Sequence, residues 1–592
     1  MSIKTIKHSL LSLTLALTAL LGAQQASAEA TYQTRIVGGT ESTQGQWPWM
    51  VLLSSSSHSN GANPPPPAYP GDPAAIPGIP HFFCGATLIS EQWVLTAAHC
   101  VVNDSAADVF AFVGLHDKND TSIAATGISQ IIVHPDYDDL TSDNDIALLK
   151  LATPATGAAT VSFIDSSTAT LLNPGNNVNV VGWGGVVAQP ASTSSSLPSL
   201  SQSYPDILRD VSMPYISNTD CNAVMNGRVT DNMMCAGVPQ GGVDSCQGDS
   251  GGPLVFSNDN GASWIQAGIV SWGYGCADAS AYGVYTRVQS YSDWVTRAIN
   301  GVTPSIRFGS WIPGKVATAQ INIENSSGVD FDFTSTISSN NAAFIVSDNC
   351  QTTLIAGQSC SVDLTFSASV EGVYNGLVSY TTNSPVLSVV GVDVVATLTS
   401  EVSFNLVEAD NSIQWALGGD NSWTEQQVTT DGRYSFQSGT ITHNQNSSLL
   451  AYVNVAGTAR DVYFDWKACS EATYDFLELW VDNKKIDARS GNAVWARKMV
   501  TLAGAGDHVI EWRYNKDYVA DYGADAGWVT NITLDAASAN PLPQHSTSCA
   551  PVATPEPTAP VSSGGGGAAI SAWAYLVFAM PLLMRRRFNR AS

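Results

Sequence analysis

The chain has 592 residues, 10 cysteines and a formal net charge of −25. This length predicts about three domains, each large enough to bury a core of its own. The negative charge argues against nucleic acid as a partner and would attract cationic substrates.

The N-terminus is predicted to be a secretory signal peptide over residues 1–28. Two lysines precede an apolar run over residues 9–21, and the Ala-Ser-Ala of residues 26–28 suits a cleavage site. Residues 29–35 would then form a short pro-segment. An exported chain enters an oxidising compartment, where its cysteines can pair.

Three short blocks carry the residue types of nucleophilic catalysis. They are Thr-Ala-Ala-His-Cys ending at Cys100, Asp-Asn-Asp-Ile-Ala-Leu around Asp145, and Gly-Asp-Ser-Gly-Gly-Pro around Ser250. A serine hydroxyl needs a base within hydrogen-bond reach, and the base needs an anion that holds its tautomer. Ser250, His99 and Asp145 fit these roles. Alone, His99 would be interpreted as a buried structural histidine, but the three blocks together favour an intact catalytic triad.

Residues 36 to about 301 resemble the chymotrypsin and trypsin family of serine endopeptidases. The resemblance implies a mainly β fold, with a two-β-barrel protease domain over residues 36–302. It implies that the backbone N–H groups of Gly248 and Ser250 form an oxyanion hole. It also implies that an extended substrate adds as a strand along Ser271–Gly273, with Ser271 near the triad aspartate.

The family places the base of its S1 specificity pocket at Asp244, six positions before Ser250. A carboxylate there selects a long cationic side chain, because an unpaired buried charge is unfavourable. Ser245 would lie beside it, and Gly273 and Gly283 would leave the pocket walls open. Cleavage after Arg or Lys is therefore expected; the alternative is that Asp244 is a solvated loop acid.

The segment Arg35-Ile36-Val37-Gly38-Gly39 resembles a zymogen activation site. Cleavage after Arg35 would free the amine of Ile36. In the family this amine turns inward and pairs with the acid before the nucleophile, here Asp249, so the uncut chain should be nearly inactive.

The cysteines are predicted to form several disulfides. The resemblance implies Cys84–Cys100, Cys221–Cys235 and Cys246–Cys276, and spacing favours a local Cys350–Cys360 bridge. The pairing of Cys469 and Cys549 is left open.

No metal or other cofactor is expected to be required. The segment that follows Gly114 lacks the glutamates with which vertebrate trypsins bind calcium, so no such site is predicted. Tyr282 stands where a proline is common in the family and resembles the tyrosine of the sodium-responsive members of the family, so it marks a candidate Na⁺ position; a plain packing change is the alternative.

The proline-rich insertion at residues 55–80 is either a semi-rigid screen against bulky substrates or a tolerated insertion.

Two further β domains are predicted after the protease. Residues 303–400 resemble an immunoglobulin-like β-sandwich that serves as a spacer, with strands near 316–325, 361–367, 374–382 and 387–398. Residues 401–537 resemble a jelly-roll-like module, with strands near 461–466, 476–481 and 508–512. Its candidate contacts to glycans or a metal are Trp512, Tyr514, Lys516, Asp517, Asp525 and Trp528; otherwise these are core aromatics and turn residues.

The C-terminus resembles the GlyGly-CTERM sorting tails of bacteria. A linker over residues 538–563 leads to a tail over 564–592, in which four glycines precede the apolar run Ala568–Met584 and an arginine cluster. In that family a rhomboid-type protease removes the tail, which implies a location at the cell surface or outside the cell. The alternative is a permanent membrane anchor.

Taken together, these features resemble the multi-domain trypsin-like proteases that vibrio-type bacteria export through the type II secretion machinery. The expected partners are protein substrates with Arg or Lys at the cleaved bond. The alternative function is that of a cell-surface adhesin or glycan-binding protein with an accessory protease domain. A decayed protease would have lost a triad residue or Arg35, and all of these are present.

Overall fold

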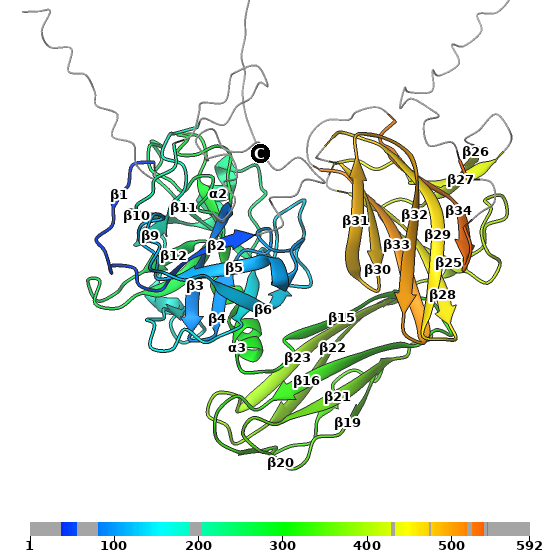
Figure 1. Ribbon diagram of the computed structural model, residues 1–592, viewed down its shortest axis with the longest axis horizontal. Coiled ribbons are helices and arrows are strands. Elements are labelled where there is room, and N and C mark those ends of the chain that lie inside the picture. Colours follow the sequence, from blue (N-terminus) through cyan, green and yellow to red (C-terminus); the bar gives the residue numbers. More distant parts are fainter. Residues whose placement is uncertain are drawn as a thin grey trace, which may run out of the picture.

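The structure, a computed structural model, describes residues 37–55, 81–189, 203–427, 433–443, 445–472, 475–517, 524–537 and 541–542. Figure 1 shows three β-rich units that follow one another along the chain. The predicted signal peptide, pro-segment and C-terminal tail lie outside the described residues, as do Arg35, Ile36 and residues 56–80 of the insertion.

Six strands of the first unit form a closed barrel in the order β2-β3-β4-β7-β6-β5. They are β2 (Met50–Ser55), β3 (His81–Ser90), β4 (Trp93–Thr96), β5 (Val109–Val113), β6 (Thr126–Val133) and β7 (Ala147–Leu151). Every residue of β2 is buried, because the two barrels of this unit share one apolar core. Since β2 pairs with β3, the proline-rich insertion connects two neighbouring antiparallel strands.

A second barrel follows, in the order β10-β11-β14-β13-β12-β9. Its strands are β9 (Asn177–Gly182), β10 (Arg209–Ile216), β11 (Met233–Ala236), β12 (Pro253–Phe256), β13 (Ile265–Trp272) and β14 (Gly283–Arg287). Pairing of β9 with both β10 and β12 closes the barrel. Short β1 (Thr40–Glu41) and β8 (Ser162–Phe163) pair with β10 and β13. The predicted two-barrel architecture is thus confirmed.

Helices are few and short in this unit. The 3₁₀ turns are η2 (Ala106–Asp108), η3 (Ala169–Leu171) and η4 (Val288–Tyr291), and the α-helices are α2 (Asn218–Val224) and α3 (Ser292–Ile299). Helix α3 is the last element of this unit. It buries Trp294, Val295 and Ala298, and the Trp294 ring lies 5.2 Å from that of His134.

The second unit consists of two main sheets around a shared core. One sheet contains β15 (Ser305–Trp311), β23 (Val389–Leu398), β22 (Gly372–Thr381) and β18 (Ser338–Ser339), and the other β16 (Ala317–Glu324), β21 (Ser359–Phe366) and β19 (Phe344–Asp348). Strands β17 (Phe331–Asp332) and β20 (Thr353–Leu354) form a separate pair. Alternate residues of β23 are buried, which is the period of two expected for a strand with one face in a core. The sequence did not predict β15, which pairs with β23 in parallel.

The third unit also has two sheets. The larger contains β24 (Glu401–Val402), β25 (Gln414–Gly419), β28 (Asn446–Val455), β33 (Gly506–Asn515), β30 (Phe476–Val481) and β31 (Lys484–Ser490), and the smaller β26 (Thr424–Gln427), β27 (Tyr434–Gln437), β34 (Ala526–Leu534), β29 (Ala459–Cys469) and β32 (Asn492–Ala503).

Five of the six candidate contacts to glycans or a metal in this unit are buried, which favours the alternative of core and turn residues. Trp512, Tyr514 and Lys516 have no exposed surface, and Asp517 and Trp528 are also buried. Asp525 accepts a hydrogen bond from the Tyr514 hydroxyl and pairs with the Lys516 ammonium. These residues therefore belong to the core and its buried polar network, because aromatic side chains at alternate positions of β33 face the opposite sheet.

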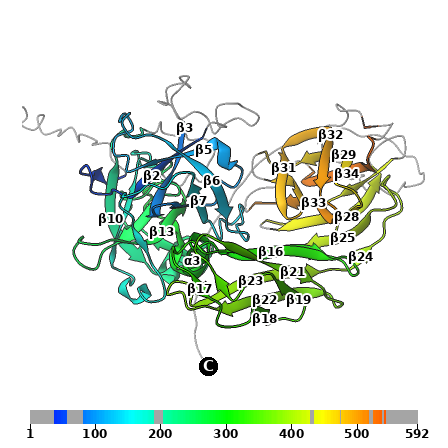
Figure 2. The ribbon, with the colours of Figure 1, turned by 60° about the horizontal axis from the view of Figure 1, so that its bottom comes forward.

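The second and third units pack closely against each other. Ala416, Leu450, Tyr452 and Val509 of the third unit belong to the core of the second. The Tyr452 hydroxyl donates to the backbone oxygen of Ser310 at 2.9 Å. Figure 2 shows the second unit beside both the protease and the third unit, so it connects the two.

The structure contains the disulfides Cys84–Cys100, Cys221–Cys235, Cys246–Cys276 and Cys350–Cys360. Cys469 is also disulfide-bonded, while Cys549 lies outside the described residues. Within the ranges given above, no helix combines the length and apolar character needed to cross a membrane.

Candidate active site

His99 and Asp145 meet because the strands before and after them pair. Strand β4 ends at Thr96, and β7 begins at Ala147, its partner in the antiparallel register. His99 follows the first strand and Asp145 precedes the second, so both lie at the same end of the barrel. The His99 Nδ1 atom lies 2.7 Å from the Asp145 carboxylate, and the backbone N–H of His99 donates to the same carboxylate at 2.9 Å.

Asp145 is fully buried, and His99 is partly exposed. Burial alone would raise the pKa of Asp145, but His99 and the Ser271 hydroxyl, 2.5 Å away, together hold it below its ordinary value. Burial lowers the pKa of His99, and the charge and hydrogen bond of Asp145 outweigh burial, so this pKa is raised. The pair therefore favours a ring that donates from Nδ1 and has its other nitrogen available as a base.

Ser250 lies in a tight turn that faces the His99 side of the first barrel. Its backbone oxygen accepts from the N–H of Gly85 at 2.8 Å. A Cβ atom on Gly251, whose φ is +74°, would lie 2.3 Å from the Thr96 hydroxyl and 2.5 Å from the Gly85 oxygen, so the close approach of the turn requires glycine there. Among the described residues, no hydrogen bond joins the Ser250 hydroxyl to the His99 ring.

Gly248 precedes this turn in a left-handed conformation with a φ of +96°, which favours glycine. Within the described ranges, the N–H groups of Gly248 and Ser250 donate no backbone hydrogen bond. Both are thus free to donate to a bound oxygen.

Asp244 is a buried carboxylate held by two backbone donors. The N–H groups of Ser245 and Ala277 donate to its two oxygens at 2.8 and 3.0 Å. Burial raises the pKa of Asp244 to about 7, although these N–H groups act in the opposite direction. The solvated-loop alternative is therefore excluded, and a cation would stabilise this buried carboxylate.

The glycines around Asp244 have different surroundings. A Cβ atom on Gly283 would lie 2.6 Å from an Asp244 oxygen, so a larger residue would fill the space above the carboxylate. At Gly273 the nearest atom would be 3.7 Å away, which leaves room along this wall. The Ser245 hydroxyl lies 3.1 Å from the Tyr285 hydroxyl.

Asp249 is fully buried and accepts N–H groups of Gly184 and Cys246 at 2.7 and 3.0 Å. Burial raises its pKa to about 6, because the two donors offset only part of the loss of water. Cβ atoms on Gly182 and Gly184 would lie 2.2 and 2.3 Å from its oxygens. Both glycines are therefore needed to accommodate the carboxylate.

The chain that follows Ile36 is docked close to Asp244. Val37 is buried with Cys246 and Cys276, and its backbone oxygen accepts from the Asp244 N–H at 3.1 Å. Gly38 has a φ of +82°, and a Cβ atom there would lie 2.5 Å from the Gly242 oxygen. The segment that follows the predicted cleavage site is thus packed against the segment that contains Asp244.

Sequence reasoning missed three contributors to this site. The Ala277 N–H and the Tyr285 hydroxyl support Asp244 and Ser245, but both are common core groups without a sequence signal. The Arg228 guanidinium lies over the Trp272 ring at 4.9 Å, although the two residues are far apart in the sequence.

Tyr282 belongs to the rim of an apolar cluster around Cys221 and Cys235, which favours the packing interpretation; a Na⁺ site there stays a prediction.

Comparisons with known proteins agree with this geometry. A family model described as Trypsin matches residues 36–295. Anionic trypsin of Bos taurus is 36% identical over 266 residues, which cover 45% of this chain and 90% of that protein. The suppressor of tumorigenicity 14 protein homolog of Bos taurus is 38% identical over 279 residues, but the chain spans only 28% of its length.

A solved structure, the secreted serine protease VesC from Vibrio cholerae, is similar at 22% identity with a TM-score of 0.45, covering 84% of this chain and 99% of that one. The match to anionic trypsin extends over nearly the whole of that enzyme. With its two six-stranded barrels, the chain therefore belongs to the trypsin family of serine endopeptidases.

Proposed function

We propose that the chain is made as a zymogen and, once cleaved after Arg35, hydrolyses peptide bonds that follow Arg or Lys. The observation that carries the specificity is Asp244, a buried carboxylate with a raised pKa beside Gly283. A substrate cation would offset the unfavourable burial of this charge, whereas a neutral side chain would leave it unpaired.

In the proposed reaction, the Ser250 hydroxyl attacks the carbonyl carbon of the substrate while His99 takes its proton. His99 then gives this proton to the leaving amine as the C–N bond breaks, and a water molecule hydrolyses the acyl-enzyme by the reverse sequence. Asp145 holds the His99 tautomer and stabilises the imidazolium. The Gly248 and Ser250 N–H groups would stabilise the oxyanion. The left-handed backbone conformation of Gly248 supports this role.

Activation would add a cationic partner for Asp249. This carboxylate is buried with only partial compensation from its N–H donors, so the amine freed at Ile36 would pair with it favourably. Docked Val37 supports the proposal, because it brings the chain immediately after Ile36 into this region.

The test of this proposal is Arg35→Gln. Wild-type precursor treated with trypsin should gain activity against a peptide library, with cleavage after Arg or Lys and a new N-terminus at Ile36. Arg35→Gln should stay inactive, because trypsin cannot cut after glutamine, and Arg460→Gln serves as the matched control. Full activity of Arg35→Gln without a new N-terminus at Ile36 would contradict zymogen activation.

We also propose that the protein is exported and that its tail is removed near the glycines. The support is the order of glycines, apolar run and arginines in the sequence. Intact-mass analysis of protein from the medium or cell surface should end between Ser563 and Gly567, with a longer form in a host that lacks the rhomboid-type protease. Peptides from Ala568–Met584 in the released protein would overturn tail removal and favour a permanent anchor.

For the accessory units we propose an immunoglobulin-like and a jelly-roll-like β-sandwich, supported by two facing sheets around a core in each. The adhesin alternative loses support, because five of its six candidate contact residues are buried.

A further inference from the structure

The segment Pro135–Asn144, called here the 135–144 loop, connects β6 to the aspartate beside His99. Two of its residues adopt left-handed conformations without being glycine, with a φ of 56° at Ser142 and 57° at Asn144. Such conformations are unfavourable for these residues and persist only where the surroundings hold them. Because Asn144 directly precedes Asp145, the position of the loop bears on the position of the Asp145 carboxylate.

Hydrogen bonds link the two ends of the 135–144 loop. The Asn144 side chain donates to the backbone oxygen of Asp136 at 2.8 Å and accepts from the Tyr291 hydroxyl at 3.0 Å. The backbone N–H of Asp138 donates to the Asp143 oxygen at 3.0 Å. Asn144 therefore connects the two aspartates: its side chain is hydrogen-bonded to Asp136, and its backbone is bonded directly to Asp145.

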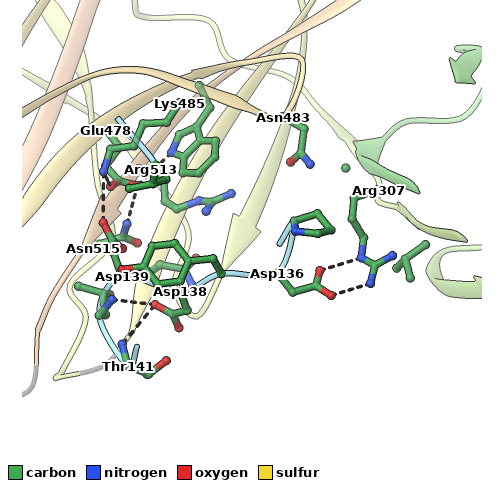
Figure 3. A pocket seen from close by; sticks show the side chains of 18 of the residues that line it. Asp136, Asp138, Asp139, Thr141, Arg307, Glu478, Asn483, Lys485, Arg513 and Asn515 are labelled. Carbon is green, nitrogen blue, oxygen red and sulfur yellow. Dashed lines mark hydrogen bonds and ion pairs between the residues drawn. The ribbon is translucent and has the colours of Figure 1, made fainter. Parts of the chain in front are cut away.

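The second unit holds the same Asp136 from outside the protease. Arg307, on β15, donates from Nε and Nη2 to both Asp136 oxygens at 2.7 and 2.6 Å, as Figure 3 shows. Its remaining Nη1 donates to the Ile306 oxygen at 3.1 Å. A two-bond arginine–carboxylate pair restricts orientation as well as distance.

The third unit reaches the loop three residues further on. The Lys485 ammonium lies 3.3 Å from an Asp139 oxygen and also pairs with Glu478, which is almost fully buried. The 135–144 loop and residues of both accessory units line a common cavity of about 390 Å³. Arg307 of the second unit and Lys485 of the third unit thus each pair with a carboxylate on the outer side of the loop.

We propose that Arg307 and Lys485 are positioning residues for Asp145, through which the two accessory units set the catalytic geometry of the protease. The proposal rests on the proposed function, in which Asp145 orients His99. Arg307 acts through Asp136 and Asn144, and Lys485 acts through Asp139 on the same loop. Neither cation touches the substrate, so they should affect the rate of the chemical step and leave S1 binding unchanged.

The test compares full-length chains cleaved at Arg35. Arg307→Met should lower kcat for an arginine p-nitroanilide about tenfold, since small displacements of catalytic groups are costly, with KM changed less than twofold. Arg307→Lys keeps the charge but loses the two-bond geometry, so it should recover part of the rate. Asp139→Ala tests the second contact, because Lys485→Met would also remove the ion-pair partner of buried Glu478. Arg460→Met, which breaks a pair with Asp535 within the third unit, is the matched control.

Two measurements separate positioning from general destabilisation. In a double-mutant cycle, Asp136→Ala with Arg307→Met should be no slower than either single variant, because both remove the same contact. The inactivation rate with diisopropyl fluorophosphate, which needs an activated serine but no cationic side chain, should fall in parallel with kcat.

Each outcome decides between the proposals. Unchanged kcat and inactivation rate in Arg307→Met, or additive losses in the cycle, would overturn the positioning role. A wild-type chain that reacts with the fluorophosphate but does not cleave after Arg or Lys would overturn only the proposed specificity, and the inactivation rates would still test Arg307. A wild-type chain that does not react would overturn the proposed triad, and the positioning role with it.

Discussion

Ser250→Ala is expected to abolish peptide hydrolysis while the chain still folds and is still cut after Arg35. Loss of the nucleophile removes the acyl-enzyme route, and in serine proteases this lowers kcat by roughly a millionfold. The Ser250 side chain makes no hydrogen bond to His99 within the described residues, so little stability should be lost. The measurement is kcat on an arginine p-nitroanilide with purified, trypsin-cleaved protein from which the trypsin has been removed.

Ser257→Ala is the matched control, since it removes a serine hydroxyl that contacts Asp259 and has no role in the proposed catalytic or S1 residues. It should retain most of the activity. Near-normal hydrolysis by Ser250→Ala would exclude Ser250 as the nucleophile.

Asp244→Ser is expected to abolish the preference for Arg and Lys. Breaking a buried ion pair costs about 3–5 kcal/mol, which corresponds to a loss of roughly a thousandfold in kcat/KM for cationic substrates. Substrates with a neutral side chain at the same position should be cleaved no more slowly than by the wild type. The measurement is kcat/KM for matched arginine and leucine substrates, and an unchanged preference for arginine would contradict the S1 assignment.

The pH dependence separates Asp244 from His99 in the same experiment. Burial raises the pKa of Asp244 to about 7, so its negative charge is lost as the pH falls through this value. The pKa of His99 is also raised, and protonation of His99 removes the base, so this too lowers activity as the pH falls. For the wild type with arginine substrates, protonation of Asp244 and protonation of His99 both lower kcat/KM at low pH. For Asp244→Ser with leucine substrates, only protonation of His99 should lower it.

Stability gives an independent control for this variant. The folded chain retains a proton on Asp244 that the unfolded chain loses near pH 4, so burial of Asp244 destabilises the fold increasingly between about pH 4 and pH 7. Asp244→Ser should therefore gain thermal stability relative to the wild type at pH 8 and not at pH 4.

The sequence alone was sufficient to predict the family and the two-barrel fold of the protease unit. The blocks around His99, Asp145 and Ser250 are local patterns whose residue types have few other uses together, and the period-two strands follow from side-chain alternation. Strand β15 escaped prediction, because parallel pairing with β23 depends on a partner distant in sequence.

Only the tertiary structure decided which polar and aromatic residues are buried. Trp512 and Tyr514 were candidates for a binding surface, and packing of two sheets placed them in a core. The same holds for the contacts of Arg307 and Lys485 with the 135–144 loop, which join residues 171 and 346 positions apart. Local sequence determines which residues can perform the chemistry, but the packing of the three β units against one another determines which distant charges meet beside it, because those contacts depend on surfaces that no local pattern encodes.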